Sequence, residues 1–189
     1  MLVHQAHFRL PGWLIERLPT LQCNYSTAED RMELAIELSR LNVEQKTGGP
    51  FGAAIFQEQS GELVSVGVNL VESSGASIAH AEVMAITLGQ LAIGNFDLRA
   101  GSHSLQLATS SEPCAMCLGA IPWSGVNSVI CGARDADVRG IGFEEGLKPL
   151  PWTEVLQYAQ ITAHADVHRE KAIAVLRRYS VEGGKIYNT

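Results

Sequence analysis

A long helix is predicted near the start of the chain by the spacing of its apolar residues. Thr27 with Asp30, or Ser26 with Glu29, can form a capping box at its beginning. The sequence Thr-Gly-Gly-Pro at 47–50 ends it, because glycine and proline interrupt helices. Between these signals, apolar side chains recur three or four positions apart, which places them on one helix face. These side chains are Met32, Ala35, Ile36, Leu38 and Leu41.

Two strands are predicted directly after this helix. GAAIFQE at 52–58 and ELVSVGVN at 62–69 are short apolar runs of the kind found in strands. The sequence Gln-Ser-Gly separates them, and so short a connection favours an antiparallel hairpin.

Helices and strands alternate through the rest of the chain. Further helices are expected over 79–92, 113–122, 153–158 and about 166–179, with a short helix start at 11–17, and strands over 105–110, 126–132 and near 161–163. This alternation predicts an α/β fold, a three-layer α/β/α sandwich with a central mixed sheet. No repeat or linker divides the chain, so residues 1–189 are expected to form a single domain.

The composition favours a folded protein without a polyanionic partner. Hydrophobic residues make up 46% of the chain and charged residues 18%, whereas disordered chains are poor in apolar residues. The net charge of −6 disfavours nucleic acid, whose phosphates are usually bound by a basic surface. The tight basic groups, at 169–171 and 177–178, lie on one predicted helix. We therefore expect no nucleic-acid partner.

The N-terminal segment does not have the pattern of a secretion signal. No run of about 18 apolar residues predicts a membrane span either. A cytoplasmic location without membrane contact is therefore expected. In that reducing compartment, closely spaced cysteines favour metal binding or catalysis over disulfide formation.

Two short motifs combine the side chains of a zinc site. His-Ala-Glu at 80–82 and Pro-Cys-Ala-Met-Cys at 113–117 each open a predicted helix. Cys114 and Cys117 lie three positions apart, so both thiols face the same side of a turn. The positive end of a helix also favours their thiolate form. With His80 as a third ligand, the fourth tetrahedral position of zinc stays open for water, as in catalytic sites.

Glu82 is suited to move protons at this site. Residues two apart do not share a helix face. The side chains of His80 and Glu82 can therefore both approach the metal only if the N-terminus of the helix points at it. Glu82 then lies beside the metal-bound water, where a carboxylate acts as general acid and base. H-x-E followed by P-C-x-x-C is the signature of zinc-dependent deaminases. A structural zinc site would need a fourth protein ligand, and no further CxxC or HxxxH pair lies near these motifs.

Other residues that could bind metal or stack on a ligand are interpreted structurally. His164 and His168 form an HxxxH pair without a companion cysteine, and are expected at the surface or in the core. Cys23 and Cys131 are expected to be buried as small apolar side chains. The three tryptophans are expected to pack against the protein rather than on a ligand. They are Trp13, Trp123 and Trp152.

The sequence resembles the cytidine-deaminase-like superfamily, and within it the short bacterial guanine deaminases. The resemblance spans roughly residues 27–147. It is carried by GGPFGAAIF (48–56), GVNLV (67–71), AHAEVMAI (79–86), SEPCAMCLGAIPW (111–123) and GIGFEEG (140–146). It implies a zinc-dependent aminohydrolase that converts a free nucleobase, above all guanine to xanthine and ammonia, with guanine-like aminotriazines as further candidate substrates.

Carried over residue by residue, the resemblance implies one zinc ion per chain, bound by His80, Cys114 and Cys117, and a proton shuttle at Glu82. Glu82 would take a proton from the zinc-activated water, and the resulting hydroxide would attack the ring carbon that bears the amine. Glu82 would then deliver protons to the ring nitrogen and to the departing ammonia.

The resemblance also implies a set of substrate contacts. Asn69 corresponds to an asparagine that hydrogen-bonds the purine, and Phe51 to an aromatic residue near the substrate. Glu145 stands where related guanine deaminases carry an aspartate, and would accept from N1–H and the 2-amino group and pass a second proton to the ammonia. Glu144 competes for this role, and the sequence does not separate the two. Ala81 is grouped with the substrate-binding residues.

Other functions stay open from the sequence. Cys-Gly-Ala-Arg-Asp-Ala at 131–136 is similar to tRNA adenosine deaminases, which share the fold and zinc motif. A cytosine or nucleoside deaminase is a second alternative. A zinc-stabilised binding module is a third, although such a module has no need of Glu82. The family resemblance also implies a homodimer, in which the C-terminal segment, about 150–189, can cross to the partner.

Overall fold

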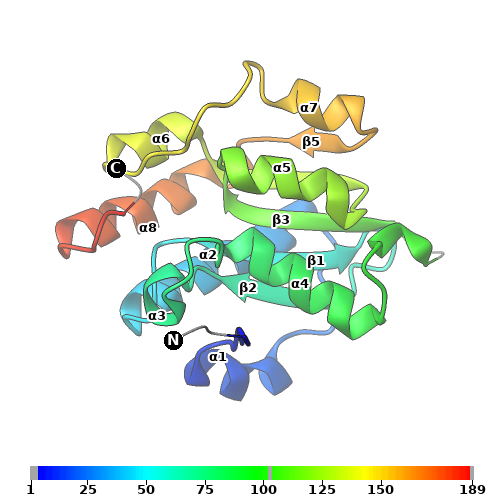
Figure 1. The fold of residues 1–189 in the computed structure, drawn as a ribbon, viewed down its shortest axis with the longest axis horizontal. Helices are drawn as coiled ribbons and strands as arrows, with labels where there is room; N and C mark the ends of the chain where they lie inside the picture. The colour runs from blue at the N-terminus through cyan, green and yellow to red at the C-terminus, as the bar shows by residue number, and fades with distance from the viewer. Residues whose placement is uncertain (1–3, 102–103, 188–189) are drawn as a thin grey trace.

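The computed structural model describes residues 4–101 and 104–187 and has a five-stranded sheet at its centre (Figure 1). The strand order is β2-β1-β3-β4-β5. β1 is antiparallel to β2 and to β3, whereas β3, β4 and β5 are parallel to one another. The strands are β1 Gly52–Gln57, β2 Leu63–Val68, β3 Leu105–Ser111, β4 Ser128–Ala133 and β5 Thr162–His164. The predicted hairpin and the mixed sheet are both confirmed.

Helices cover both faces of this sheet. One apolar core includes residues of α2 and α8, and a second, on the other face, includes residues of α4, α5 and α7. In Figure 1, α4 and α5 lie in front of the strands and α8 lies behind them. These helices are α2 Ala28–Glu44, α4 Ala81–Ile93, α5 Ala115–Ser124, α7 Thr153–Tyr158 and α8 Arg169–Val181. The predicted three-layer α/β/α sandwich is therefore confirmed.

Shorter elements connect the main ones. They are α1 Gly12–Arg17, α3 Val71–Ser74, α6 Asp135–Gly140 and two 3₁₀ turns, η1 Leu18–Thr20 and η2 Leu98–Ala100. Helix α1 matches the helix start expected at 11–17. The sequence analysis did not predict α3 and α6, because one turn or two are too few for an apolar repeat to appear. None of the helices in the described ranges is long and apolar enough to cross a membrane.

The first turn of α2 shows which of the two possible capping boxes forms. The Thr27 hydroxyl accepts from the Asp30 N–H at 3.0 Å, and the Asp30 carboxylate accepts from the Thr27 N–H at 3.1 Å. Ser26 instead donates to the Asn24 side chain at 3.0 Å. Thr27 is therefore the N-cap, and its bonds satisfy two backbone donors that the helix leaves free.

Three helices begin two or three residues later than the sequence pattern predicted. Helix α4 begins at Ala81 rather than at 79, because His80 is its N-cap. Helix α5 begins at Ala115, because Cys114 is its N-cap and the Cys114 sulfur accepts from the Cys117 N–H at 3.5 Å. Helix α8 begins at Arg169, because Asp166 and His168 precede it with φ angles of 66° and 52°, in the left-handed region.

The burial of two side chains differs from the prediction. Cys23 is exposed rather than buried, because its carbonyl accepts from Leu63 at the outer edge of β2 and its segment lies along that edge. Trp123 is 86% exposed at the end of α5 rather than packed. The predictions for Cys131 and Trp152 are confirmed, since both are buried. Trp13 also packs against the core.

The HxxxH pair lies away from the motif helices. His164 is exposed at the end of β5. His168 is half-buried, and its Nε2 lies 3.8 Å from Glu33. Both positions agree with the structural interpretation of these histidines.

Candidate metal centre and pocket

The sheet topology brings the two motif helices together. Strands β2 and β3 are both antiparallel to β1, so they run in the same direction and end at the same edge of the sheet. Helix α4 comes after β2 and helix α5 after β3. The N-termini of α4 and α5 therefore meet, with His80 as the N-cap of one and Cys114 as the N-cap of the other.

Three side chains at these helix ends fit one zinc ion. Nδ1 of His80 lies 3.4 Å from Sγ of Cys114 and 3.6 Å from Sγ of Cys117. Zinc bonds of about 2.3 Å to sulfur and 2.0–2.1 Å to nitrogen, at a tetrahedral angle, separate the two ligand atoms by about 3.6 Å. The three ligand atoms all lie within 4.8 Å of one another. The geometry thus suits three ligands of a zinc site with one open position.

The local electrostatics favour the thiolate form of Cys114, whereas the hydrogen bond with Cys114 and burial raise the pKa of Cys117. Hydrogen bonding from Cys117, helped by His80, lowers the pKa of Cys114 to about 4 despite its burial. A thiolate is the form of cysteine that binds zinc. The positive end of α5 acts in the same direction, because both thiols lie in its first turn.

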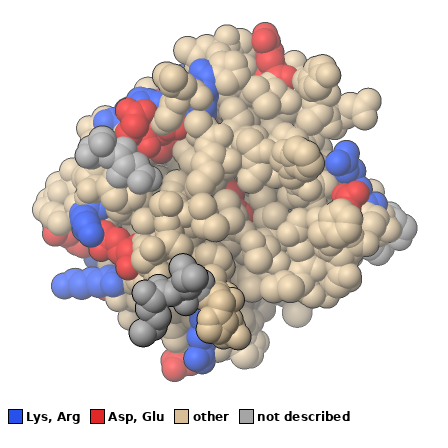
Figure 2. Space-filling model, viewed as in Figure 1, with Lys and Arg blue, Asp and Glu red and all other residues tan. Residues whose placement is uncertain are grey.

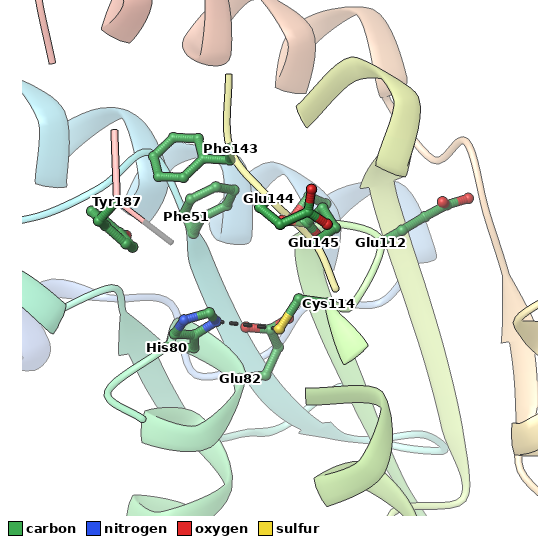
Figure 3. Close-up of a pocket in the computed structure, with 10 residues that line it drawn as sticks. Phe51, His80, Glu82, Glu112, Cys114, Phe143, Glu144, Glu145 and Tyr187 are labelled. Carbon is green, nitrogen blue, oxygen red and sulfur yellow. Dashed lines mark hydrogen bonds between the residues drawn. The ribbon is translucent and has the colours of Figure 1, made fainter. Parts of the chain in front are cut away.

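Glu82 lies beside this cluster, in the first turn of α4. It is buried, with 5% of its surface exposed, and Figure 3 shows its carboxylate between His80 and Cys114. Burial raises its pKa, and the neighbouring Cys114 adds to the shift. A carboxylate with a raised pKa next to an open metal position can both accept and return a proton near neutral pH.

A cavity opens above the cluster. It is lined by Phe51, His80, Glu82, Ser111, Glu112, Cys114, Phe143, Glu144, Glu145 and Tyr187. Aromatic rings form one wall, with Phe143 in edge contact with Phe51 at 5.2 Å and with Tyr187 at 5.0 Å between ring centres (Figure 3). The free volume is about 20 Å³, room for one water molecule. Entry of a planar ring therefore requires lining side chains to move.

The structure separates the two candidate carboxylates, although both line the cavity. Glu144 is exposed, and its pKa is lowered by its hydrogen bond with Arg139. Glu145 is buried, with 7% of its surface exposed. Burial and the nearby Cys114 raise the pKa of Glu145 to about 8, although Lys148 opposes the shift. Glu145 therefore has the environment of a ligand-binding carboxylate, and Glu144 that of a surface ion pair.

The loop that carries both glutamates is tied to α5 and α6. The N–H of Ala115 donates to the carbonyl of Glu145 at 2.8 Å. Lys148 is nearly buried, and its ammonium donates to the carbonyl of Pro113 at 2.8 Å. It also lies 2.6 Å from Asp135 and 3.9 Å from Glu145. Glu145 is thus held over the first turn of the cysteine helix.

Asn69 and Phe51 meet at the ends of the first two strands. The Asn69 N–H donates to the Phe51 carbonyl at 3.1 Å, one step beyond the β1–β2 ladder. Asn69 is fully buried, and its Nδ2 has no hydrogen-bond partner among the described residues. Ala81 lies elsewhere, because its side chain packs in the core on the α4 face and does not line the cavity.

Four lining residues were missed by the sequence analysis: Ser111, Glu112, Phe143 and Tyr187. Phe143 lies inside the segment GIGFEEG, and Ser111 and Glu112 lie inside SEPC. The carboxylate of Glu112 accepts from the N–H of Asp135 at 2.8 Å and so ties the motif to α6. Tyr187 had no local signal, because it reaches the cavity only through the path of the chain beyond α8.

Comparisons with known proteins agree with this geometry. Residues 25–133 match the family model described as the cytidine and deoxycytidylate deaminase zinc-binding region. The chain is 37% identical to the guanine deaminase of Bacillus subtilis (strain 168) over 117 residues, 62% of this chain and 71% of that protein. Its fold is similar to the solved guanine deaminase from Nitrosomonas europaea, with a TM-score of 0.90 and 38% identity over 96% of this chain and 99% of that one.

A second group of relatives is matched over a shorter segment. The chain is 37% identical to the tRNA-specific adenosine deaminase of Bacillus subtilis (strain 168) over 92 residues. That match covers 49% of this chain and about half, 53%, of that protein. Similarity to the Nitrosomonas structure, in contrast, extends over nearly the whole of both chains.

Proposed function

Since this chain belongs to the zinc-binding cytidine and deoxycytidylate deaminase family, we propose that it hydrolyses guanine to xanthine and ammonia. One observation carries the proposal. A buried Glu82 beside a three-ligand zinc cluster shares a small cavity with a second buried carboxylate, Glu145. Glu82 suits the proton transfers of hydrolytic deamination, which is common to the family. Glu145 suits a base such as guanine, whose edge presents hydrogen-bond donors.

The residues of the cluster have separate tasks in this reaction. His80, Cys114 and Cys117 hold the zinc ion. Bound there, zinc supplies a Lewis acid that lowers the pKa of water at the open position towards about 7. Glu82 accepts a proton from the attacking water as the oxygen bonds to C2 of guanine. Its return of that proton to the ring nitrogen completes the first half of the reaction.

The second half releases the amine. A second proton reaches the amino group on C2, and the C2–N bond breaks as the new hydroxyl on C2 loses its proton and becomes the carbonyl. Ammonia leaves, and xanthine is the other product. Glu145 is the group proposed to carry this proton, because it faces the same cavity and burial keeps its pKa near neutrality, at about 8. Water and guanine supply every atom of the two products.

Recognition of guanine is assigned to the edge and the faces of the base. Guanine presents N1–H and the 2-amino group as donors, which the Glu145 carboxylate would accept through charge-assisted bonds. Asn69 would offer its unpartnered Nδ2 to an acceptor on the ring. Phe51 and Phe143 would contact the ring faces. Aminotriazines that present the same donors are proposed as further substrates. Ala81 would contribute to substrate binding only indirectly, as the residue between His80 and Glu82, because its side chain is in the core.

The tRNA adenosine deaminase alternative is less well supported. Its basis is a match to half of the chain. A tRNA loop needs exposed cations, but three of the four basic side chains of α8 lie against carboxylates. Arg169 bonds Asp137 at 2.7 Å, and Lys171 and Arg178 pair with Glu33 and Glu44. We therefore propose a free base, rather than nucleic acid, as the substrate.

The cellular setting follows from this substrate. Conversion of guanine to xanthine is a step of purine breakdown, and we propose that it takes place in the cytoplasm. All four cysteines are free thiols, which suits a reducing compartment.

A homodimer is proposed on the basis of exposed apolar side chains. They lie on α5, on α7 and on the segment that joins α6 to α7: Met116, Trp123, Leu147, Leu150 and Tyr158. Figure 2 shows that the face over α4 and α5 carries few charged side chains. The C-terminal segment, about 150–189, begins at this surface, and we propose it as the part that can exchange between subunits.

A panel of amines tests the function. Ammonia release is measured from guanine, adenine, cytosine, guanosine, adenosine, an aminotriazine and a tRNA with an adenosine in its anticodon loop. We expect guanine to give the highest kcat/KM, and adenine and adenosine, which lack the N1–H donor, to be poor. Faster turnover of tRNA, with binding that weakens steeply as salt rises, would favour the adenosine deaminase instead. Zinc-loaded protein without activity on any of these compounds would favour a binding module.

A further inference from the structure

A buried chain of hydrogen bonds runs from helix α1 to the residue proposed to hold the base. Asn42, near the end of α2, is fully buried. Its Nδ2 donates to the carbonyls of Gly49 and Asn69, each at 2.9 Å. Its Oδ1 accepts from the Thr47 hydroxyl at 2.6 Å. The same hydroxyl accepts from the indole N–H of Trp13 at 3.0 Å.

Hydrogen-bonding capacity fixes the direction of this chain. Carbonyl oxygens only accept, so the amide of Asn42 must present its NH₂ group to Gly49 and Asn69. Its oxygen then faces Thr47 and needs a donor. The hydroxyl of Thr47 has one proton to give, and an indole N–H is always a donor. Every bond therefore points from Trp13 towards Asn69, an arrangement in which neighbouring bonds strengthen one another.

The backbone around Asn69 is held tightly from this side. A Cβ on Gly48 would lie 1.9 Å from the Asn69 carbonyl oxygen, so the backbone at Gly48 packs in direct contact with the Asn69 peptide. The side chain of Asn69 lies next to the cavity residue Tyr187. A Cβ on Gly49 would lie 2.5 Å from the Tyr187 hydroxyl and 3.4 Å from Oδ1 of Asn69. A small shift of the Asn69 backbone would therefore move its free Nδ2 relative to a bound base.

We propose that Asn42, Thr47 and Trp13 form a positioning relay that sets the Asn69 amide for the base. The inference rests on the proposed function, because it assigns Asn69 to the substrate. It adds α1 to the binding apparatus, although Trp13 lies outside residues 25–133 that match the family. The three relay residues touch no substrate atom and act through Asn69.

Removal of one hydroxyl tests the relay with little change of shape. Thr47→Val takes away both the donor to Asn42 and the acceptor of the Trp13 indole N–H, whereas Thr47→Ser keeps both. Of these two bonds, only the one to Asn42 leads on to Asn69, and loss of one buried hydrogen bond corresponds to roughly a three- to tenfold effect. We expect Thr47→Val to raise KM for guanine by that factor with kcat changed less than about twofold, because Asn69 binds ground and transition states alike. Thr47→Ser restores KM, and Trp13→Phe gives a smaller rise.

A matched control separates positioning from general stability. Ser124 also has a buried hydroxyl, which donates to the Ile121 carbonyl at 2.7 Å at the end of α5, outside the relay and the cavity lining. Ser124→Ala is expected to lower Tm about as much as Thr47→Val does and to leave KM unchanged. A KM rise of the same size in Ser124→Ala would overturn the relay.

A double-mutant cycle with Asn69→Ala tests whether the relay acts through Asn69. In that background Thr47→Val should change kcat/KM by less than about 1.5-fold, since the target of the relay is gone. The full effect persisting in Asn69→Ala overturns the proposal, as does an unchanged KM in Thr47→Val alone.

A measurement on the substrate-free protein tests the relay independently of the proposed function. If wild-type protein does not deaminate guanine, the function fails and the relay is judged by ¹⁵N relaxation of the Asn69 side-chain amide. The relay predicts a more mobile amide in Thr47→Val and wild-type order in Ser124→Ala. Equal order in wild type and Thr47→Val overturns it.

Discussion

At the scale of single residues, Glu82 is the side chain on which the proposed chemistry depends. It is buried beside the metal ligands but is not needed to bind the metal. Glu82→Gln keeps the size of the side chain, but it replaces one acceptor oxygen by an NH₂ donor and cannot carry a proton. General acid–base catalysis contributes about 10²–10⁴-fold, and several transfers pass through this residue, so we expect a loss at the upper end. The measurement is ammonia release from guanine, with metal analysis of the same sample.

The metal content is the control for this variant. Glu82→Gln is expected to keep one zinc ion per chain, whereas Cys117→Ala loses both zinc and activity because it removes a ligand. Near-normal turnover in Glu82→Gln would contradict the mechanism. Zinc retained in Cys117→Ala would remove that residue from the ligand set.

The two adjacent glutamates form a matched pair of single-residue tests. Glu145 is buried in the cavity, whereas Glu144 is exposed and ion-paired with Arg139. A charge-assisted hydrogen bond is worth about 1.5–3 kcal/mol, so Glu145→Gln should lower kcat/KM for guanine at least ten- to a hundredfold. Glu144→Gln should stay within about threefold of wild type, since exposed ion pairs contribute little. Wild-type rates in both variants would show that neither carboxylate binds guanine. Equal losses of kcat/KM in the two variants would contradict the assignment of guanine binding to the buried Glu145 rather than to the exposed Glu144.

At the scale of elements, the sequence pattern predicted the features that depend only on neighbouring residues in the chain. The apolar spacing of α2 and the candidate zinc ligands at the starts of α4 and α5, one and two respectively, were visible in the sequence, because each depends on residues within one or two turns. Tyr187 was not, because its place in the cavity depends on the path of the chain after α8. The choice between Glu144 and Glu145 was equally out of reach, since it depends on the burial of one and the pairing of the other with Arg139.

The N-terminus of α2 gives a prediction at this scale. Thr27→Ala removes the side chain that accepts from Asp30, and loss of such a cap costs about 1 kcal/mol. For a chain of this size, that lowers Tm by about 2–4 °C. Calorimetry of Thr27→Ala against Ser26→Ala checks it, because Ser26 loses only a bond to Asn24 outside the helix. An equal or larger drop in Ser26→Ala would contradict the assignment of the cap.

At the scale of the whole molecule, one arrangement of strands explains why the site exists. Because β1 lies between two strands antiparallel to it, the helices that follow β2 and β3 start side by side. The positive ends of the two helices then meet where His80, Cys114 and Cys117 lie, and in the proposed reaction they would stabilise the developing negative charge. Asn69, at the end of β2, reaches the same sheet edge for the same reason.

The assembly gives the last prediction. Trp123 is 86% exposed at the end of α5. Leu147 and Leu150, in the segment before α7, and Tyr158, at the end of α7, are 100%, 88% and 95% exposed. Exposed apolar patches of this kind mark interaction sites, and burial against a second copy would cover them on both subunits at once. Sedimentation velocity should therefore give twice the 20.4 kDa of one chain. Trp123→Glu should shift the protein to monomer, because an unpaired carboxylate would be buried at the interface. Val181→Glu is the control, since Val181 is equally exposed, at 87%, but lies at the end of α8 on the opposite face of the sheet.

Two outcomes would contradict this prediction. A monomeric wild-type protein would show that no homodimer forms. A Trp123→Glu protein that stays dimeric would place the interface on another surface.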